Sequence, residues 1–252
     1  MFVMRSIVEQ EPGLPNTTRI TDAPPSAGVV SIGDHFTAGN IHLISNFWGL
    51  DTFMDLPLPD KQLKLAFIST GSKPYIEHDV PARFLDAERA WLEKKQAEGR
   101  ITFFECCLTD CEDSDDVGNT LADVDVIFMG GGNTQYLLEK IQDSGARPII
   151  KELVDSGVWY LGKSAGAVVA GPDIDPRGFL LETMQTRSLT DTSGLGLTDV
   201  YPMPHIDTPT IMSREYNGKT GWQIAVEMTR VARTAYILDN TDQNKQSAAA
   251  AP

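Results

Sequence analysis

Short apolar runs alternate with helical patterns along most of the chain, and this alternation is the strongest constraint on its fold. The runs are rich in β-branched and aromatic residues, as strands buried on both faces require. Strands that alternate with helices predict an α/β fold, with a mainly parallel sheet covered by helices on both faces and sites at the carboxyl ends of its strands. The runs are IHLIS (41–45), LKLAFIS (63–69), ITFFECC (101–107), VDVIFM (124–129), VWYL (158–161) and AYIL (235–238).

Three segments between these runs have the pattern of helices. Residues 81–96 place apolar side chains near one face and charged side chains on the other, and Gly99 ends the pattern. Residues 134–141 carry a second apolar set that ends before Gly145, and a short third helix is predicted over 148–155.

The chain is expected to form one domain with an extension at each end. Residues 1–40 contain EPGLP and DAPPS, with only VVSI as a candidate strand, and are predicted to be a partly irregular N-terminal extension. Residues 41–240 hold the α/β domain, and residues 241–252, with the biased run QSAAAAP, form a tail. A chain of 252 residues with 41% hydrophobic content can build one domain with a full core.

Charge and composition exclude several classes of partner. The formal charge of -14 and a pI near 4.6 disfavour binding to nucleic acid and to anionic membrane surfaces.

The start of the sequence lacks a signal-peptide pattern and no run of 18 apolar residues occurs, so we expect a cytoplasmic protein. Three cysteines close together in sequence, without a nearby histidine, predict reduced thiols, and we expect neither a metal nor a cofactor.

The stretch GVWYLGKSAG matches two catalytic patterns at once. Gly157, Gly162, Lys163 and Ser164 spell the phosphate-binding G-x-x-x-x-G-K-S, whereas Gly162, Ser164 and Gly166 spell the nucleophile elbow G-x-S-x-G. A phosphate loop needs a strand before its first glycine, but here the helical IIKELVDS precedes it and VWYL has the character of a strand. The elbow is therefore favoured, with AGAVVAG beginning the next helix.

A nucleophilic serine needs hydrogen-bond donors that stabilise the oxyanion formed when it attacks a carbonyl carbon. The N-terminus of the following helix supplies the backbone N–H of Ala165, and the GGGNT loop at 130–134 is placed to supply a second donor. Asn133 and Thr134 of that loop either cap the next helix or contact substrate.

The serine also needs a general base, and His205 in YPMPHID is the favoured histidine because it follows the elbow on a backbone stiffened by two prolines. Position along the chain does not choose the carboxylate that orients it. The candidates between or beside the serine and the histidine are Asp173, Asp175, Glu182, Asp191 and Asp207.

Three blocks of the sequence, GGGNTQYLL, YLGKSAGAVVAGPDI and GLGLTDVYPMPHID, resemble the peptidase E or S51 family of serine peptidases. The likeness covers roughly residues 41–240 and implies a flavodoxin-like sandwich related to class I glutamine amidotransferases. It implies that Ser164 is the nucleophile, His205 the base and Glu182 the acid. Asp191 is the alternative to Glu182.

The resemblance also implies the remaining site residues. The backbone N–H groups of Gly131 or Gly132, together with that of Ala165, would form the oxyanion hole. Asn133, Thr134 and Lys163 are the predicted substrate-binding residues. Lys163 departs from the uncharged residue expected before the serine, and the other candidate cations for a substrate carboxylate are Arg177, Arg187 and Arg214.

The expected activity is hydrolysis of small peptides with an amino-terminal aspartate through an acyl-enzyme. The alternatives are a cyanophycinase-like activity, another small-molecule amidase or esterase, and a binding protein on the same scaffold without a working triad. A small peptide is the expected partner, and a homodimer is a possible assembly.

Overall fold

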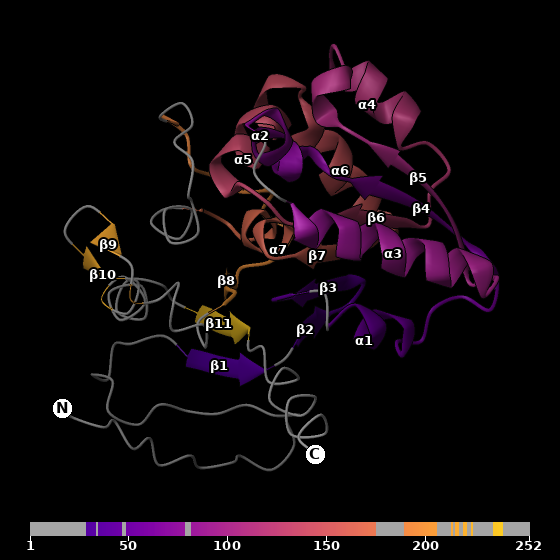
Figure 1. Ribbon diagram of the computed structural model, residues 1–252, viewed down its shortest axis with the longest axis horizontal. Helices are drawn as coiled ribbons and strands as arrows, with labels where there is room; N and C mark the ends of the chain where they lie inside the picture. The colour runs from indigo at the N-terminus through magenta and orange to yellow at the C-terminus, as the bar shows by residue number, and fades with distance from the viewer. Residues whose placement is uncertain are drawn as a thin grey trace.

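A six-stranded sheet forms the centre of the chain in the computed structural model (Figure 1). The structure describes residues 29–33, 35–46, 49–78, 82–174, 189–205, 213, 215–216, 219–220, 223 and 234–238. The strand order is β2-β3-β7-β6-β4-β5, in which only the β2–β3 pair is antiparallel. The predicted mainly parallel sheet is therefore confirmed. Its strands are β2 (His35–Ala38), β3 (Ile41–Ile44), β4 (Leu63–Ile68), β5 (Ile101–Cys106), β6 (Val126–Met129) and β7 (Trp159–Lys163).

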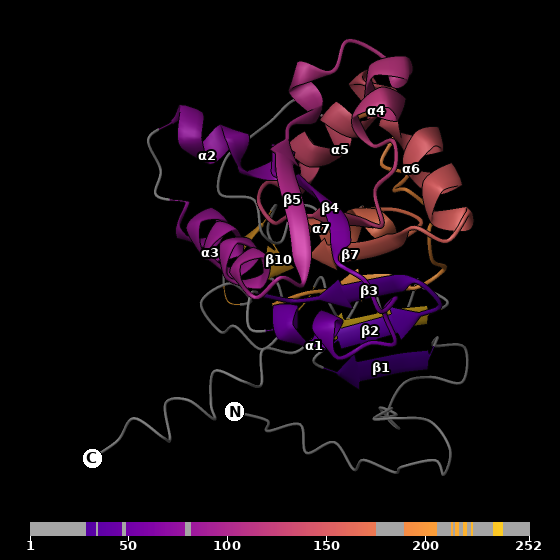
Figure 2. The ribbon, with the colours of Figure 1, turned by 90° about the vertical axis from the view of Figure 1, so that its right-hand side faces the viewer.

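Helices cover both faces of this sheet, as Figure 2 shows for α3 on one side and α5 and α6 on the other. Helices α1 and α3 pack into one apolar cluster, and α4, α5, α6 and α7 pack into the other. The helices are α1 (Leu50–Met54), α2 (Lys73–Glu77), α3 (Arg83–Ala97), α4 (Ser114–Thr120), α5 (Thr134–Asp143), α6 (Ala146–Asp155) and α7 (Ala165–Ala170), with short 3-10 turns at Thr70–Ser72 and Leu108–Asp110.

The central strands are apolar on both faces because alternate side chains enter different cores. Leu65 and Phe67 of β4 join the cluster under α1 and α3, whereas Ala66 and Ile68 join the cluster on the opposite face. The same alternation runs along β6. A continuous apolar run is therefore the sequence signature of these strands.

A smaller parallel sheet has the order β1-β11-β8. Its strands are β1 (Val29–Gly33), β11 (Thr234–Leu238) and β8 (Tyr201–Met203). A short antiparallel pair, β9 (Glu215–Tyr216) and β10 (Lys219–Thr220), lies between β8 and β11 in sequence. Both β1 and β2 fall in residues 1–40, so part of the predicted extension belongs to the two sheets. The domain limits themselves stay a prediction.

The three helices predicted from apolar patterns correspond to α3, α5 and α6, and the helix predicted to begin at AGAVVAG corresponds to α7. Helix α4 was not predicted because it buries only Val117, so its sequence carries no apolar stripe. Its start depends on Asp113, whose carboxylate accepts from the backbone N–H groups of Asp115 and Asp116.

Candidate active site

Ser164 lies in a tight turn between β7 and α7. Its backbone has φ 52° and ψ -111°, a conformation that costs a non-glycine residue free energy and that must be held by its surroundings. Its N–H donates to the Ile44 carbonyl at 3.0 Å. Helix α6 precedes Gly157, and β7 occupies most of the space between the two glycines of the phosphate-loop pattern. Ser164 therefore lies between a strand and a helix, as expected for the elbow pattern, and its role as a nucleophile stays a prediction.

Gly166 allows the turn to pack directly on the end of β6. A β-carbon at this position would lie 2.0 Å from the Met129 carbonyl oxygen, so no larger residue fits. The Gly166 N–H donates to Gly130 O at 3.2 Å, and the buried Tyr160 hydroxyl donates to Gly166 O at 2.7 Å. These contacts fix the start of α7 against the loop that follows β6.

His205 meets the serine from a distant part of the chain. Its Nε2 lies 2.9 Å from Ser164 Oγ, which is hydrogen-bonding distance for transfer of the hydroxyl proton. His205 has φ 62°, and its backbone N–H donates to Ser45 Oγ at 2.9 Å. The structure thus brings together the two residues that the sequence singled out as nucleophile and base.

Ser45 is a site residue that the sequence reasoning missed. It is buried, and its Oγ lies 3.5 Å from His205 Nδ1 as well as accepting the His205 N–H. Ile44 pairs with Lys163 across the sheet, so Ser45 and Ser164 leave neighbouring strands at the same edge. No sequence signal marks it, because only the strand order places β3 beside β7.

The acid of the predicted triad, Glu182, lies outside the described residues, as do Asp175 and Asp207. The alternative Asp191 is described: its carboxylate accepts from the Ser193 N–H at 2.9 Å and faces Arg147 at 3.6 Å. The hydrogen bonds from Ser193 are the main reason that the pKa of Asp191 is lowered. Asp191 is thus engaged with these two residues, and the identity of the acid stays a prediction.

The loop after β6 lies beside the serine, and its N–H groups have different partners. The Gly131 N–H donates to Glu88 Oε1 at 2.9 Å, so this bond competes with the predicted role of Gly131 as an oxyanion donor. Gly132, with φ 130°, packs on the Gly71 carbonyl so closely that an added β-carbon would lie 2.1 Å from its oxygen. The N–H of Ala165 is among the first N–H groups of α7, which have no partner within the helix. The donor role of Gly132 stays a prediction.

The predicted substrate-binding residues have structural partners. Asn133 is the N-cap of α5, with its side-chain oxygen accepting from the Tyr136 N–H at 2.8 Å, and Thr134 is buried as the first residue of that helix. Lys163 is also buried, and its ammonium lies 2.9 Å from Glu88 Oε1. The structure therefore places Lys163 in an internal ion pair, which disfavours its predicted contact with substrate.

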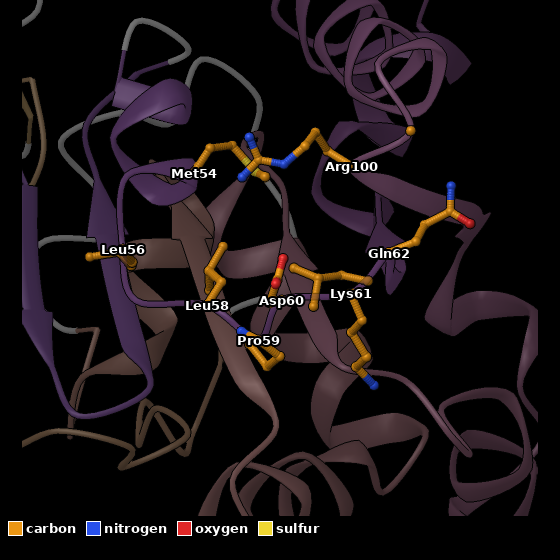
Figure 3. A pocket seen from close by; sticks show the side chains of 10 residues that line it. Met54, Leu56, Leu58, Pro59, Asp60, Lys61, Gln62 and Arg100 are labelled. Carbon is orange, nitrogen blue, oxygen red and sulfur yellow. The ribbon is translucent and has the colours of Figure 1, made fainter.

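A cavity of about 380 Å³ lies elsewhere, between the segment after α1 and the segment from α3 to β5 (Figure 3). Its lining includes Leu63 at the start of β4 and Arg100 just before β5. Leu63 and Arg100 lie at the amino ends of parallel strands, whereas Ser164 follows the carboxyl end of β7. The cavity is therefore at the opposite end of the sheet's strands from Ser164. It is not part of the site.

The cysteines lie as free thiols in the part of the chain that the structure describes. Burial is the main cause that raises the pKa of Cys106, at the end of β5, to about 12. A thiol with this pKa is protonated at neutral pH and is a poor nucleophile.

Comparison with known proteins gives a consistent result. The sequence model of peptidase family S51 matches residues 61–244. An uncharacterized peptidase of Pasteurella multocida is 29% identical over 155 residues, which are 62% of this chain and 70% of that protein. Peptidase E of Shewanella amazonensis is 27% identical over 196 residues, 68% of this chain and 77% of that protein.

A solved structure supports the fold. The crystal structure of a candidate peptidase E protein from Listeria monocytogenes matches with a TM-score of 0.60 and 24% identity, covering 81% of this chain and 92% of that one. Within the described ranges, no helix combines the length and apolar character needed to cross a membrane.

Proposed function

The chain belongs to peptidase family S51 and is a serine peptidase, and from this premise we propose that it removes an amino-terminal aspartate from small peptides. The observation that carries the catalytic part of the proposal is the 2.9 Å contact between Ser164 Oγ and His205 Nε2, at a serine with positive φ. The aspartate preference rests on the resemblance of the three sequence blocks to peptidase E.

The proposed reaction begins when His205 Nε2 accepts the Ser164 hydroxyl proton as Oγ attacks the peptide carbonyl. The N–H groups of Gly132 and Ala165 donate to the resulting oxyanion. The protonated His205 then gives its proton to the leaving amine as the C–N bond breaks. Water, deprotonated by the same histidine, releases the acyl group and restores the serine.

Contacts at the backbone N–H and at Nδ1 of His205 support its role as the general base. Ser45 accepts the His205 backbone N–H at 2.9 Å and its Oγ lies 3.5 Å from Nδ1, and both contacts support a role for Ser45 in orienting the imidazole. Glu182 remains the proposed carboxylate of a triad. A group at Nδ1 that favours the Nδ1–H tautomer leaves Nε2 free to accept the serine proton.

Recognition of a substrate carboxylate requires a cation. Lys163 is paired with Glu88, so the proposed candidates are Arg177, Arg187 and Arg214, which lie outside the described residues. We also propose a cytoplasmic location and a homodimer, both of which rest on the sequence alone.

A dipeptide panel tests the proposal. Purified protein is given peptides that differ only in the first residue, with an aspartyl-arginine polymer and simple amides and esters as further substrates. We expect cleavage of the Asp-X peptides, lost in Ser164→Ala and kept in Ser156→Ala, which makes the same change at the exposed end of α6. Cleavage only of the polymer, amides or esters contradicts the dipeptidase assignment, and a fully active Ser164→Ala contradicts the mechanism.

A further inference from the structure

A buried ion pair includes Lys163, the residue that precedes Ser164 in the chain. Glu88 of α3 and Lys163 of β7 are 1% and 4% exposed, and Glu88 Oε1 is 2.9 Å from Lys163 Nζ. Neither residue has a role in the reaction derived above. Taking two charges out of water is costly, and apolar residues of similar size are often at least as stabilising. Such a pair therefore invites a functional explanation.

The pair joins the two parts of the proposed site. Lys163 is covalently next to Ser164, and the same Glu88 oxygen that contacts its ammonium also accepts the Gly131 N–H at 2.9 Å. Gly131 in turn precedes Gly132, a proposed oxyanion donor. One carboxylate oxygen thus links the residue before the nucleophile to the loop that would stabilise the oxyanion.

The fit between loop and serine is tight at this point. A β-carbon on Gly131 would lie 3.1 Å from Lys163 Nζ and 3.5 Å from Ser164 Cβ. The Lys163 ammonium also lies 5.5 Å from the centre of the Phe84 ring, a cation–π distance. The ammonium end of the lysine is therefore held by two neighbours, and the loop lies close to it.

The hydrogen bonding of Glu88 is incomplete in a way that argues against a purely stabilising role. Its second oxygen, Oε2, is buried and has no hydrogen-bond partner among the described residues. A buried charge with an unsatisfied oxygen is a poor contributor to stability. The first oxygen, in contrast, has two donors that belong to the site.

We propose that Glu88 and Lys163 are positioning residues that set the distance between the loop at 130–132 and Ser164, and so aim the Gly132 N–H at the oxyanion. This inference rests on the proposed serine peptidase function. With Gly131 N–H directed to Glu88, the orientation of the preceding peptide is fixed, and Gly132 is presented from a defined backbone. Loss of the pair would let the loop shift without removing any group that touches substrate.

The test compares Glu88→Gln, Lys163→Met and the combination of both. The matched control is Arg89→Gln, which breaks a half-exposed ion pair with Glu105 at the next position of α3. For each protein, kcat and KM are measured on a peptide that the wild type cleaves. The concentration of active sites used for kcat is determined by titration of the serine with a fluorophosphonate. The rate of fluorophosphonate labelling and the melting temperature are measured as well.

Glu88→Gln is expected to lower kcat and the labelling rate by about 10- to 100-fold, with KM within about twofold, because the oxyanion donors are misplaced in the transition state. Arg89→Gln should leave both rates unchanged. The combined variant removes both buried charges, so it should regain much of the melting temperature lost in either single variant while kcat stays low.

Recovery of kcat together with the melting temperature in the combined variant would overturn the inference, as would an unchanged kcat per titrated site in Glu88→Gln. If a single variant does not fold, the combined variant decides. A wild-type protein that neither cleaves peptides nor is labelled refutes the proposed function itself, and this inference with it. Equal labelling of wild type and variants refutes the positioning role alone.

Discussion

His42 is expected to make the protein less stable in mild acid. Its ring is buried in β3 with both nitrogens in contact with hydroxyls: Thr37 Oγ1 lies 2.7 Å from Nδ1 and Thr52 Oγ1 lies 2.9 Å from Nε2. Thr52 donates its own proton to the Gly49 carbonyl, so it accepts from Nε2–H, and Nδ1 accepts from Thr37. Burial, with a smaller contribution from nearby His35, lowers the pKa of His42 to about 3.

The size and sign of the effect follow from this pKa. In the unfolded chain the same imidazole binds a proton near pH 6.5, so below that pH the unfolded state holds more protons and stability falls as the pH falls. Between pH 7 and pH 5 the loss from this one residue is about 2 kcal/mol, and at pH values below 3 it approaches about 5 kcal/mol.

Urea unfolding at several pH values between 8 and 5 measures the effect. In His42→Gln we expect a lower free energy of unfolding at pH 8, since the two hydroxyl contacts are altered, but a smaller decrease toward pH 5. Carboxylates with lowered pKa values, such as Asp51 and Glu105, contribute equally to both proteins, so the difference between the curves isolates His42. Parallel curves for wild type and variant would refute the reasoning.

Two further substitutions test the geometry of the site, and a third serves as a control. Ser45→Ala removes the acceptor of the His205 N–H and should lower kcat by about tenfold at unchanged KM, because the imidazole loses its fixed orientation; an unchanged kcat per titrated site would contradict this role. Gly166→Ala places a β-carbon 2.0 Å from Met129 O and should cost about 3 kcal/mol or more of unfolding free energy. Gly118→Ala, with nothing within 4 Å of the new carbon, should instead stabilise α4 by about 0.5–1 kcal/mol; equal effects of the two changes would count against the packing described for the turn.

The fold could be predicted from local sequence because its main strands are buried on both faces. Runs such as LKLAFIS and VDVIFM carry that information without reference to the rest of the chain. Ser164 and His205 could also be found, since the turn chemistry around the serine is local and the histidine follows a stiff Pro-rich segment. In the structure, Ser164 Oγ and His205 Nε2 lie 2.9 Å apart, and their catalytic roles stay predictions.

Ser45 and Glu88 could not be found in this way. Ser45 reaches His205 only because β3 pairs with β7, and strand order is not written in any one segment. Glu88 was assigned to the charged face of the helix over 81–96, but it is 1% exposed because Lys163 and Gly131 meet it inside the protein. A buried charge paired with a residue far along the chain looks like a surface charge in the sequence. The unexpected lysine before the serine was the only hint.

The most direct test of the central claim is covalent labelling of the protein with a fluorophosphonate, followed by mass spectrometry and peptide mapping. We predict one adduct, on Ser164, that is absent in Ser164→Ala and forms about 100-fold or more slowly in His205→Ala, because the histidine must accept the serine proton. An adduct on another residue, or equally fast labelling without His205, would contradict the account.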